Sequence, residues 1–160
     1  MDHCSPGMTS VIESREMNPN DAITLQRMMG LEKPTYLSHF TAFSEPGALY
    51  NQCLAAKSDG FFSLFMNNQL AGFFCMRGID QGYTKPSFGV YVSSKYQGKG
   101  LARMALIDAE KWCEKHSIPW IMLKVADTNN RAYQLYTRNG FVPTGRCTQS
   151  GQTMMEKRIL

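Results

Sequence analysis

The stretch Tyr96-Gln97-Gly98-Lys99-Gly100-Leu101-Ala102 constrains the fold of this chain more than any other. Its two glycines have no Cβ atom, so the backbone can turn tightly and successive N–H groups can converge on an oxyanion. Residues 87–92 before it are rich in aromatic and β-branched side chains, which predicts a strand. Apolar side chains then recur at helical spacing from Leu101 to about His116. This order predicts a phosphate site at the start of the helix.

Two familiar phosphate motifs do not fit this stretch. A Walker A loop requires a glycine where Ser93 stands and a serine or threonine where Gly100 stands. A dinucleotide fingerprint requires a small residue in place of Arg103 and glycines directly after the strand. The sequence therefore argues against a P-loop NTPase and against a Rossmann dinucleotide site.

Two other signatures occur at the expected distance from each other. Gln97, Gly100 and Ala102 match the pattern Gln/Arg-x-x-Gly-x-Gly/Ala. Downstream, Asn129-Asn130-Arg131-Ala132-Tyr133-Gln134-Leu135-Tyr136 followed by Asn139-Gly140-Phe141 matches Asn-x-x-Ala-x-x-x-Tyr-x-x-x-Gly-Phe. With both signatures, the chain resembles the GNAT superfamily of acetyl-CoA-dependent N-acetyltransferases.

Length and composition predict a single domain over residues 9–160, after a flexible polar tail of residues 1–8. A chain of 160 residues with 43% hydrophobic residues is long enough for one well-buried core and short for two. The net charge of +4 comes from scattered basic residues, so no nucleic acid partner is expected. A modest positive charge suits an anionic cofactor.

Cysteine and histidine spacing predicts no metal site. The five cysteines include no C-x-x-C pair, and the three histidines show no metal-ligand spacing with them. We expect buried free thiols in a reducing compartment. No leader-like segment and no apolar run of 18 residues occurs, so we expect a soluble cytoplasmic protein that does not bind a membrane. The cysteines are Cys4, Cys53, Cys75, Cys113 and Cys147.

Periodicity and turn residues predict the order of the helices and strands. Asn67-Asn68 is expected to form a two-residue hairpin loop. In the strand after it, Ala71, Phe73 and Cys75 are expected on one face and Leu70, Gly72, Phe74 and Met76 on the other. Strands are predicted at 9–16, 61–66, 69–77, 87–92, 120–125, 141–147 and 152–159, and helices at 19–30, 46–57, 101–116 and 129–139.

This order is the one that the resemblance implies for the fold. We expect an α/β (α+β) architecture with a mixed, mostly antiparallel sheet of about seven strands and helices on both faces. The strands at 87–92 and 120–125 are parallel neighbours of a right-handed β-α-β unit. In the family these two strands splay apart.

The resemblance also implies the acetyl-CoA site. Backbone groups of Tyr91 and Val92 would pair with the amides of the pantetheine arm. Asn129 would hydrogen-bond that arm, or it serves only as the N-cap of its helix. Lys99 either adds charge near the phosphates or stays solvated. The backbone N–H groups expected to bind the pyrophosphate are those of Gln97, Gly98, Lys99, Gly100, Leu101 and Ala102.

Tyr136 is the predicted catalytic residue. A neutral amine attacks the thioester carbonyl, and Tyr136 gives a proton to the departing thiolate. The alternative is that Tyr136 is a core aromatic residue of its helix. Oxyanion stabilisation would come from a backbone N–H near Tyr91 or Val92, if that strand bulges as in the family.

No general base is assigned. The strand at 87–92 contains no aspartate or glutamate, so one common solution is absent. Glu45, Asp80, Asp127 and His39 are the candidates elsewhere, and each has a simpler interpretation as a loop, cap or surface residue. A water chain that ends in solvent fits equally well.

Three functions agree with these residues. The first is direct acetyl transfer, in a ternary complex, to a primary amine of a small molecule. The second is acetylation of protein N-termini or lysines, and the third is a non-catalytic module that binds acyl-CoA. The acceptor, the use of a different acyl-CoA and the oligomeric state stay open, with a homodimer as one expected assembly.

Overall fold

The computed structural model describes residues 10–37 and 43–160. The predicted tail of residues 1–8 and the candidate base His39 lie outside these ranges. Every predicted strand and helix is present, with ends within about three residues of those expected. The strands are β1 (Ile12–Glu16), β2 (Gly60–Met66), β3 (Gln69–Arg77), β4 (Ser87–Val92), β5 (Trp120–Val125), β6 (Val142–Arg146) and β7 (Thr153–Arg158). The helices are α1 (Pro19–Gly30), α2 (Ala48–Ala55), α3 (Leu101–Lys115) and α4 (Asn130–Arg138), with short 3-10 turns η1 (Ile79–Gln81) and η2 (Ser94–Tyr96).

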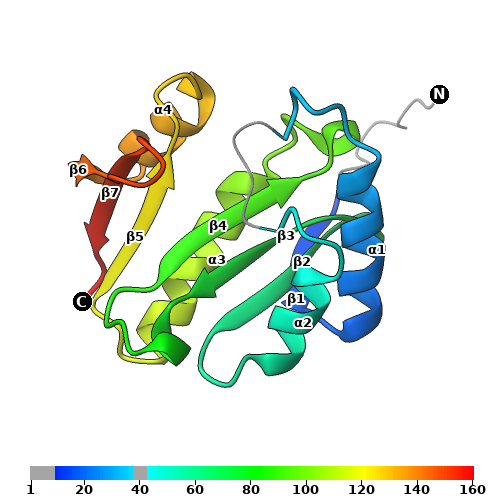
Figure 1. The fold of residues 1–160 in the computed structure, drawn as a ribbon, viewed down its shortest axis with the longest axis horizontal. Helices are drawn as coiled ribbons and strands as arrows, with labels where there is room; N and C mark the ends of the chain where they lie inside the picture. Colours follow the sequence, from blue (N-terminus) through cyan, green and yellow to red (C-terminus); the bar gives the residue numbers. More distant parts are fainter. Residues whose placement is uncertain (1–9, 38–42) are drawn as a thin grey trace.

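The strands form one seven-stranded sheet in the order β1-β2-β3-β4-β5-β7-β6. β4 and β5 are parallel, and the other neighbours are antiparallel. Figure 1 shows α1 and α2 on the near side, at the part of the sheet formed by β1 to β3, and α3 behind the sheet. The predicted mixed sheet with helices on both faces is therefore confirmed.

Local sequence explains where α1 and α4 begin and end. Asn18 caps α1 in a capping box with Asp21, one residue before the predicted start signal. At the end of α4, Gly140 adopts φ 91°, and the N–H of Phe141 returns to the carbonyl of Tyr136 at 3.0 Å. This cap turns Phe141 back into the core, where it is 2% exposed.

Each face of the sheet has its own apolar core. The core under α3 and α4 contains Phe74, Met76, Leu106 and Tyr136 among others. The core under α1 and α2 is centred on Phe73 and contains Leu25, Leu49 and Tyr91. Because both faces of β3 and β4 are covered, these strands read as apolar runs in the sequence.

A bulge in β3 breaks the predicted alternation of its side chains. The pairing with β2 changes register between Leu64 and Phe65, which leaves Ala71 as an extra residue in β3. Ala71 therefore packs in the core under α3, and Leu70 packs against the core under α1. The prediction that placed Ala71 on the face of Phe73 is wrong, because one inserted residue reverses the two faces.

β4 and β5 separate along their length. They pair at one position, Ser87 with Met122, and the N–H of Met122 donates to the carbonyl of Pro86 at 3.0 Å. Toward the C-terminal end of β4 the two strands diverge (Figure 1). β4 keeps an unbroken register against β3 as far as Val92, so the bulge lies in β3 and not in β4. The predicted splay is confirmed.

Two further observations concern the described residues as a whole. No helix in them is long and apolar enough to cross a bilayer. Within residues 10–37 and 43–160, no group of three or more His, Cys, Asp or Glu side chains is arranged to hold a metal ion.

The described cysteines are free thiols in two kinds of environment. Cys75 and Cys113 are buried, as predicted, and burial raises the pKa of each to about 11. Cys53 is half-buried, and burial again raises its pKa. Cys147 differs, because hydrogen bonds from Ser150 lower its pKa to about 7. Cys147 lies in the β6–β7 turn and, like Cys53, is only partly buried, so the prediction of buried thiols is wrong for these two.

We expect Cys147 to react with iodoacetamide faster than Cys53, which is similarly exposed. Because the pKa of Cys147 is lowered, its thiolate is present above about pH 7, whereas Cys53, whose pKa is raised, stays protonated there. Peptide mass spectrometry of a Cys4→Ser variant measures both rates. The Cys147 rate should rise from about pH 6 to about pH 8 and then level off. Faster labelling of Cys53 would contradict the assignment.

We expect Gly72→Ala to destabilise the protein. A Cβ atom on Gly72 would overlap the carbonyl oxygen of Tyr91, since β3 and β4 approach closely next to the bulge. The overlap should cost about 2 kcal/mol and lower Tm by roughly 4–8 °C. Gly30→Ala is the matched control, because nothing lies within 4 Å of its added Cβ. Equal melting temperatures of the two variants in calorimetry would refute the close approach.

Candidate functional site

The gap between β4 and β5 opens into a cleft made of two adjoining cavities. The first, of about 650 Å³, lies against the N-terminus of α3 and is here named the α3 cavity. The second, of about 340 Å³, lies between β4, β5 and the segment after α1, and is named the β5 cavity. They share the wall residues Tyr36, Val90, Val92, Gln97, Asn129, Ala132 and Tyr136. Seven shared residues make them two halves of one cleft.

The glycine turn forms one end of the α3 cavity. Gly98 and Gly100 have φ of 77° and 89°, the left-handed conformation that favours glycine. Gly100 is the N-cap of α3, and the first helical bond runs from Met104 N–H to its carbonyl. The N–H groups before Met104 have no helical partner, which favours an anion at this end. Of the residues predicted here, Gln97, Gly98, Gly100, Leu101 and Ala102 line the cavity.

Lys99 does not join them. Its side chain is exposed and lies outside the lining of both cavities. The positive charge comes instead from Arg103, Arg131 and Arg138, and no acidic residue is among the described residues that line the α3 cavity. Sequence reasoning missed these arginines. The seven-residue spacing of Arg131 and Arg138, which repeats one helix face, was the available signal.

The backbone of β4 presents alternate residues to the gap. The N–H of Ser93 donates to the carbonyl of Ala71 at 2.7 Å, so alternate β4 residues, including Tyr91, turn their backbone groups toward β3. The backbone groups of Val90 and Val92 then face the gap. The register therefore favours Val90 over Tyr91 for the predicted backbone pairing with a ligand, and it supports Val92.

Tyr36 already occupies part of this open edge. Its hydroxyl donates to the carbonyl of Val92 at 2.5 Å. The pKa of Tyr36 is raised, first by burial and then by the charge of Glu32. The charge of Arg131 across the cleft opposes this shift but does not cancel it. Tyr36 also lines both cavities, so it stands at their junction.

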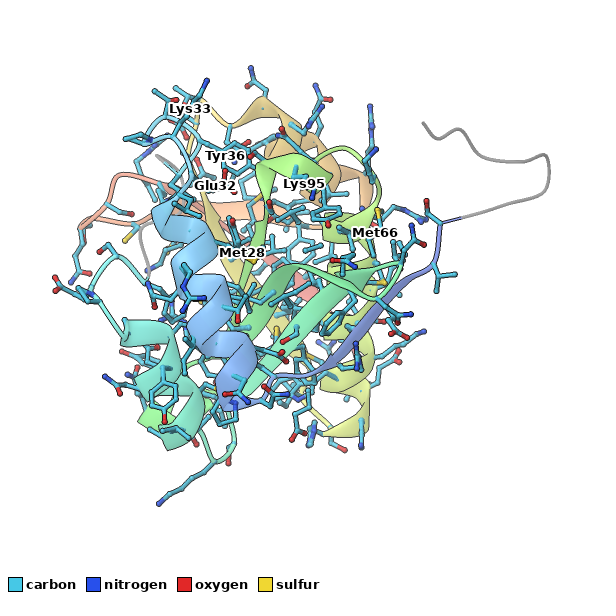
Figure 2. The ribbon with its side chains drawn as sticks, turned by 90° about the vertical axis from the view of Figure 1, so that its right-hand side faces the viewer. Met28, Glu32, Lys33, Tyr36, Met66 and Lys95 are labelled. Atoms are coloured by element: carbon cyan, nitrogen blue, oxygen red, sulfur yellow. The ribbon has the colours of Figure 1, made fainter. Side chains whose placement is uncertain are left out.

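Glu32 ties the segment after α1 to the end of β4 and the start of η2. It accepts hydrogen bonds from the Tyr91 hydroxyl at 2.6 Å, the Ser94 hydroxyl at 2.6 Å and the Ser94 N–H at 3.0 Å. Burial alone would raise the pKa of Glu32, but the hydrogen bonds from Ser94 and Tyr91 outweigh it and the pKa is lowered. Figure 2 shows Glu32 and Tyr36 together beyond the end of α1, on the side of Lys95.

The segment after α1 thus has two functions that its sequence left open. Thr35, Tyr36 and Leu37 line the β5 cavity, while Phe43 packs in the core under α1. Sequence reasoning missed Glu32, because its partners are about 60 residues away and no local pattern marks them.

Asn129 and Tyr136 lie on the wall shared by the two cavities. The side-chain oxygen of Asn129 accepts from the N–H of Ala132 at 3.3 Å, so Asn129 caps α4 and also lines the cleft. This placement is compatible with both predicted roles of Asn129, as the N-cap of its helix and as a hydrogen-bond partner of the pantetheine arm. Ala132 lies one turn before Tyr136 on the same wall, where its small side chain leaves room.

Tyr136 combines a buried ring with an accessible hydroxyl. The residue is 7% exposed, and its ring packs against Phe88 and Phe141. Its hydroxyl makes no hydrogen bond to a described residue, and no described buried polar side-chain atom lacks a partner. The hydroxyl therefore reaches the cleft. Burial raises the pKa of Tyr136, which keeps the phenol protonated over the whole range of working pH.

Two candidate bases have structural functions. Asp80 accepts hydrogen bonds from three backbone N–H groups of residues 57–59, and those bonds lower its pKa. Asp127 accepts from the hydroxyl of Thr153 at 2.7 Å and from Arg146 at 2.9 Å, and its pKa is lowered too. Neither carboxylate lines the cleft.

The other candidate bases add no group to the cleft. Glu45 is exposed and lines neither cavity, and His39 lies outside the described residues. No described carboxylate or histidine lines the β5 cavity. Proton removal at this site therefore has no side-chain base among the described residues.

Solved structures share this fold at low sequence identity. PaiA N-acetyltransferase from Thermoplasma acidophilum, in complex with coenzyme A, is 23% identical, with a TM-score of 0.74 over 92% of this chain and 99% of that one. Spermidine N-acetyltransferase from Vibrio cholerae, in complex with CoA and spermine, is 21% identical, with a TM-score of 0.76 over 92% and 95%. RimL, a ribosomal L7/L12 α-N-protein acetyltransferase, is 15% identical, with a TM-score of 0.77 over 96% and 93%.

Comparison of the sequence itself gives the family. No curated protein matched the chain significantly. A profile described as the acetyltransferase (GNAT) family matches residues 25–141. The match covers the glycine turn, the diverging strands β4 and β5 and the helix that carries Tyr136. The chain belongs to the GNAT family of acetyltransferases.

Proposed function

We propose that this enzyme transfers the acetyl group of acetyl-CoA directly to the primary amine of a small molecule, in a ternary complex. One observation carries the proposal: Tyr136 is part of the wall that the α3 and β5 cavities share, and its hydroxyl reaches the cleft. A thioester entering from the α3 cavity and an amine entering from the β5 cavity would meet at this hydroxyl.

The α3 cavity suits the cofactor. The backbone N–H groups of the glycine turn and the three arginines supply donors and positive charge for the phosphates of CoA. The gap-facing backbone groups of Val90 and Val92 offer an edge to the pantetheine amides. A pantetheine amide on Val92 would take the place of the Tyr36 hydroxyl. Asn129 contributes its side-chain amide from the facing helix.

The chemical step needs few groups. The neutral amine nitrogen attacks the thioester carbonyl, and the carbonyl oxygen becomes an oxyanion that a gap-facing β4 N–H can stabilise. As the intermediate collapses, the C–S bond breaks and the thiolate takes the Tyr136 proton. The nitrogen loses its extra proton to water, because no described base lines the β5 cavity. Solvent then returns a proton to Tyr136.

The size of the β5 cavity supports a small acceptor. Its volume of about 340 Å³ lies within the usual range of small-ligand pockets. Relatives with this fold include a spermidine acetyltransferase and an N-terminal protein acetyltransferase, so the fold itself serves both acceptor classes. Acetylation of a peptide α-amine or a lysine is the alternative that the assay must separate.

The decisive experiment measures CoA release from acetyl-CoA with a panel of small amines and peptides. Turnover of small amines is expected, and turnover of peptides alone would reject the small acceptor. In the same assay Tyr136→Phe should lower kcat by about 10²- to 10⁴-fold while acetyl-CoA affinity stays nearly unchanged, because the phenol acts on the leaving thiolate.

Tyr133→Phe is the matched control for this variant. Tyr133 lies on the same helix, packs against the same core and lines neither cavity. Its kcat should equal that of the wild type. A Tyr136→Phe enzyme with wild-type kcat, under single-turnover conditions that isolate chemistry, would remove Tyr136 from the mechanism.

Gly100→Val should weaken binding of CoA at least about tenfold in calorimetry. The side chain would project from a left-handed position into the α3 cavity, where the diphosphate must approach the backbone. Gly82→Val is the matched control. Gly82 has a similar φ of 92°, is exposed and lies outside the cleft, so it carries the backbone strain without the steric block. Equal CoA affinities in the two variants would exclude the glycine turn as the phosphate site.

A further inference from the structure

We infer that the acceptor carries an anionic group, a carboxylate or a phosphate, in addition to its amine, and that Lys124 binds this group. The inference rests on the proposed function, since it names the chemical class of the acceptor for the same site.

The position of Lys124 follows from strand alternation in β5. Ile121, Leu123 and Val125 are buried in the core under α3. Lys124 therefore points to the opposite side of the sheet, and it is exposed there. It lines the β5 cavity, on the proposed acceptor side of the cleft, and it does not line the α3 cavity.

Lys124 carries the only charge among the described residues that line the β5 cavity. Its ammonium makes no hydrogen bond or ion pair with a described residue, and its field makes a minor contribution to the lowered pKa of Cys147. Each neighbouring cation has a polar partner of its own, and for Lys85 that partner is an acid. Lys85 contacts Glu156 at 2.8 Å, and Arg77 donates to the side chain of Gln52 at 3.1 Å.

Positive charge also lines a groove beyond the acceptor side. A further cavity of about 450 Å³, here named the α2 groove, shares Lys124 with the β5 cavity and is also lined by Arg77, Lys85 and Asp59. The Asp59 carboxylate is occupied by the N–H groups of Gly78 and Asp80, at 3.2 and 3.0 Å. An anion that extends from the amine toward the groove would therefore meet a cation without a protein partner.

This charge distribution disfavours a polyamine acceptor. A second ammonium group would meet Lys124 with no carboxylate on the described lining of the β5 cavity to neutralise it. The Vibrio cholerae enzyme of the same fold was solved with spermine, so the fold tolerates polyamines and the difference must come from the lining. The phosphates of CoA do not explain Lys124 either, because three arginines line the α3 cavity and Lys124 does not.

The test uses matched amines and measures kcat and KM for each. The anionic probes are 4-aminobutanoate, 6-aminohexanoate and phosphoethanolamine, and their partners are butylamine, hexylamine and ethanolamine, with putrescine as the dication. The best anionic probe should exceed its neutral partner in kcat/KM by about tenfold, through a lower KM. The advantage should shrink as ionic strength rises. Comparison of the carboxylates with phosphoethanolamine distinguishes the two anion types.

Variants assign the effect to Lys124. Lys124→Gln should abolish the anion preference with kcat and the KM for acetyl-CoA unchanged, Lys124→Arg should retain it, and Lys124→Glu should favour putrescine. Lys115→Gln removes an exposed charge at the end of α3 and should change nothing. Equal kcat/KM for neutral and anionic amines in the wild type would overturn this inference alone. An anion preference that survives Lys124→Gln would do the same. Turnover of peptides alone would reject the small acceptor of the proposed function and this inference with it. Turnover of no amine at all would reject the transferase proposal with it.

Discussion

The separation of β4 and β5 is the constraint on which the rest of the structure depends. Two parallel strands joined at one pair leave backbone N–H and C=O groups facing a gap, and such groups are costly unless they find partners. Val90 and Val92 present these groups to the cleft. The fold therefore keeps a strand edge open to the cleft, and a ligand with amide groups is a natural partner for it.

In the structure, the segment after α1 satisfies part of that edge. The Tyr36 hydroxyl donates a hydrogen bond to the carbonyl of Val92, and the Glu32 carboxylate accepts hydrogen bonds from the hydroxyls of Tyr91 and Ser94. The same segment walls the β5 cavity. Under the proposed function, a pantetheine amide that displaced the Tyr36 hydroxyl from Val92 would therefore also disturb the wall of the β5 cavity. The two halves of the cleft thus share one segment as well as one wall.

The sequence predicted what local patterns determine, and missed what distant residues determine. The glycine turn, the capped end of α4 and the hairpin at Asn67-Asn68, where both φ values are positive, follow from residues a few positions apart. The bulge at Ala71 follows from pairing between strands, and Glu32 meets Ser94 across 62 residues. Arg131 stands at a variable position of the second motif, so the motif assigns it no role, and it lines the α3 cavity because the fold places α4 beside the glycine turn.

The two halves of the cleft differ in how their cations are arranged. Three arginines line the α3 cavity, and planar guanidinium groups suit phosphates that bind in a fixed place. A single lysine lines the β5 cavity, on a flexible stem and at the mouth of the α2 groove. Under the proposed function, an ammonium on a flexible stem can follow acceptors of different length, and it does not line the α3 cavity. Under the proposed function, a fixed set of donors would therefore hold the cofactor, and the acceptor preference would change through one position on β5.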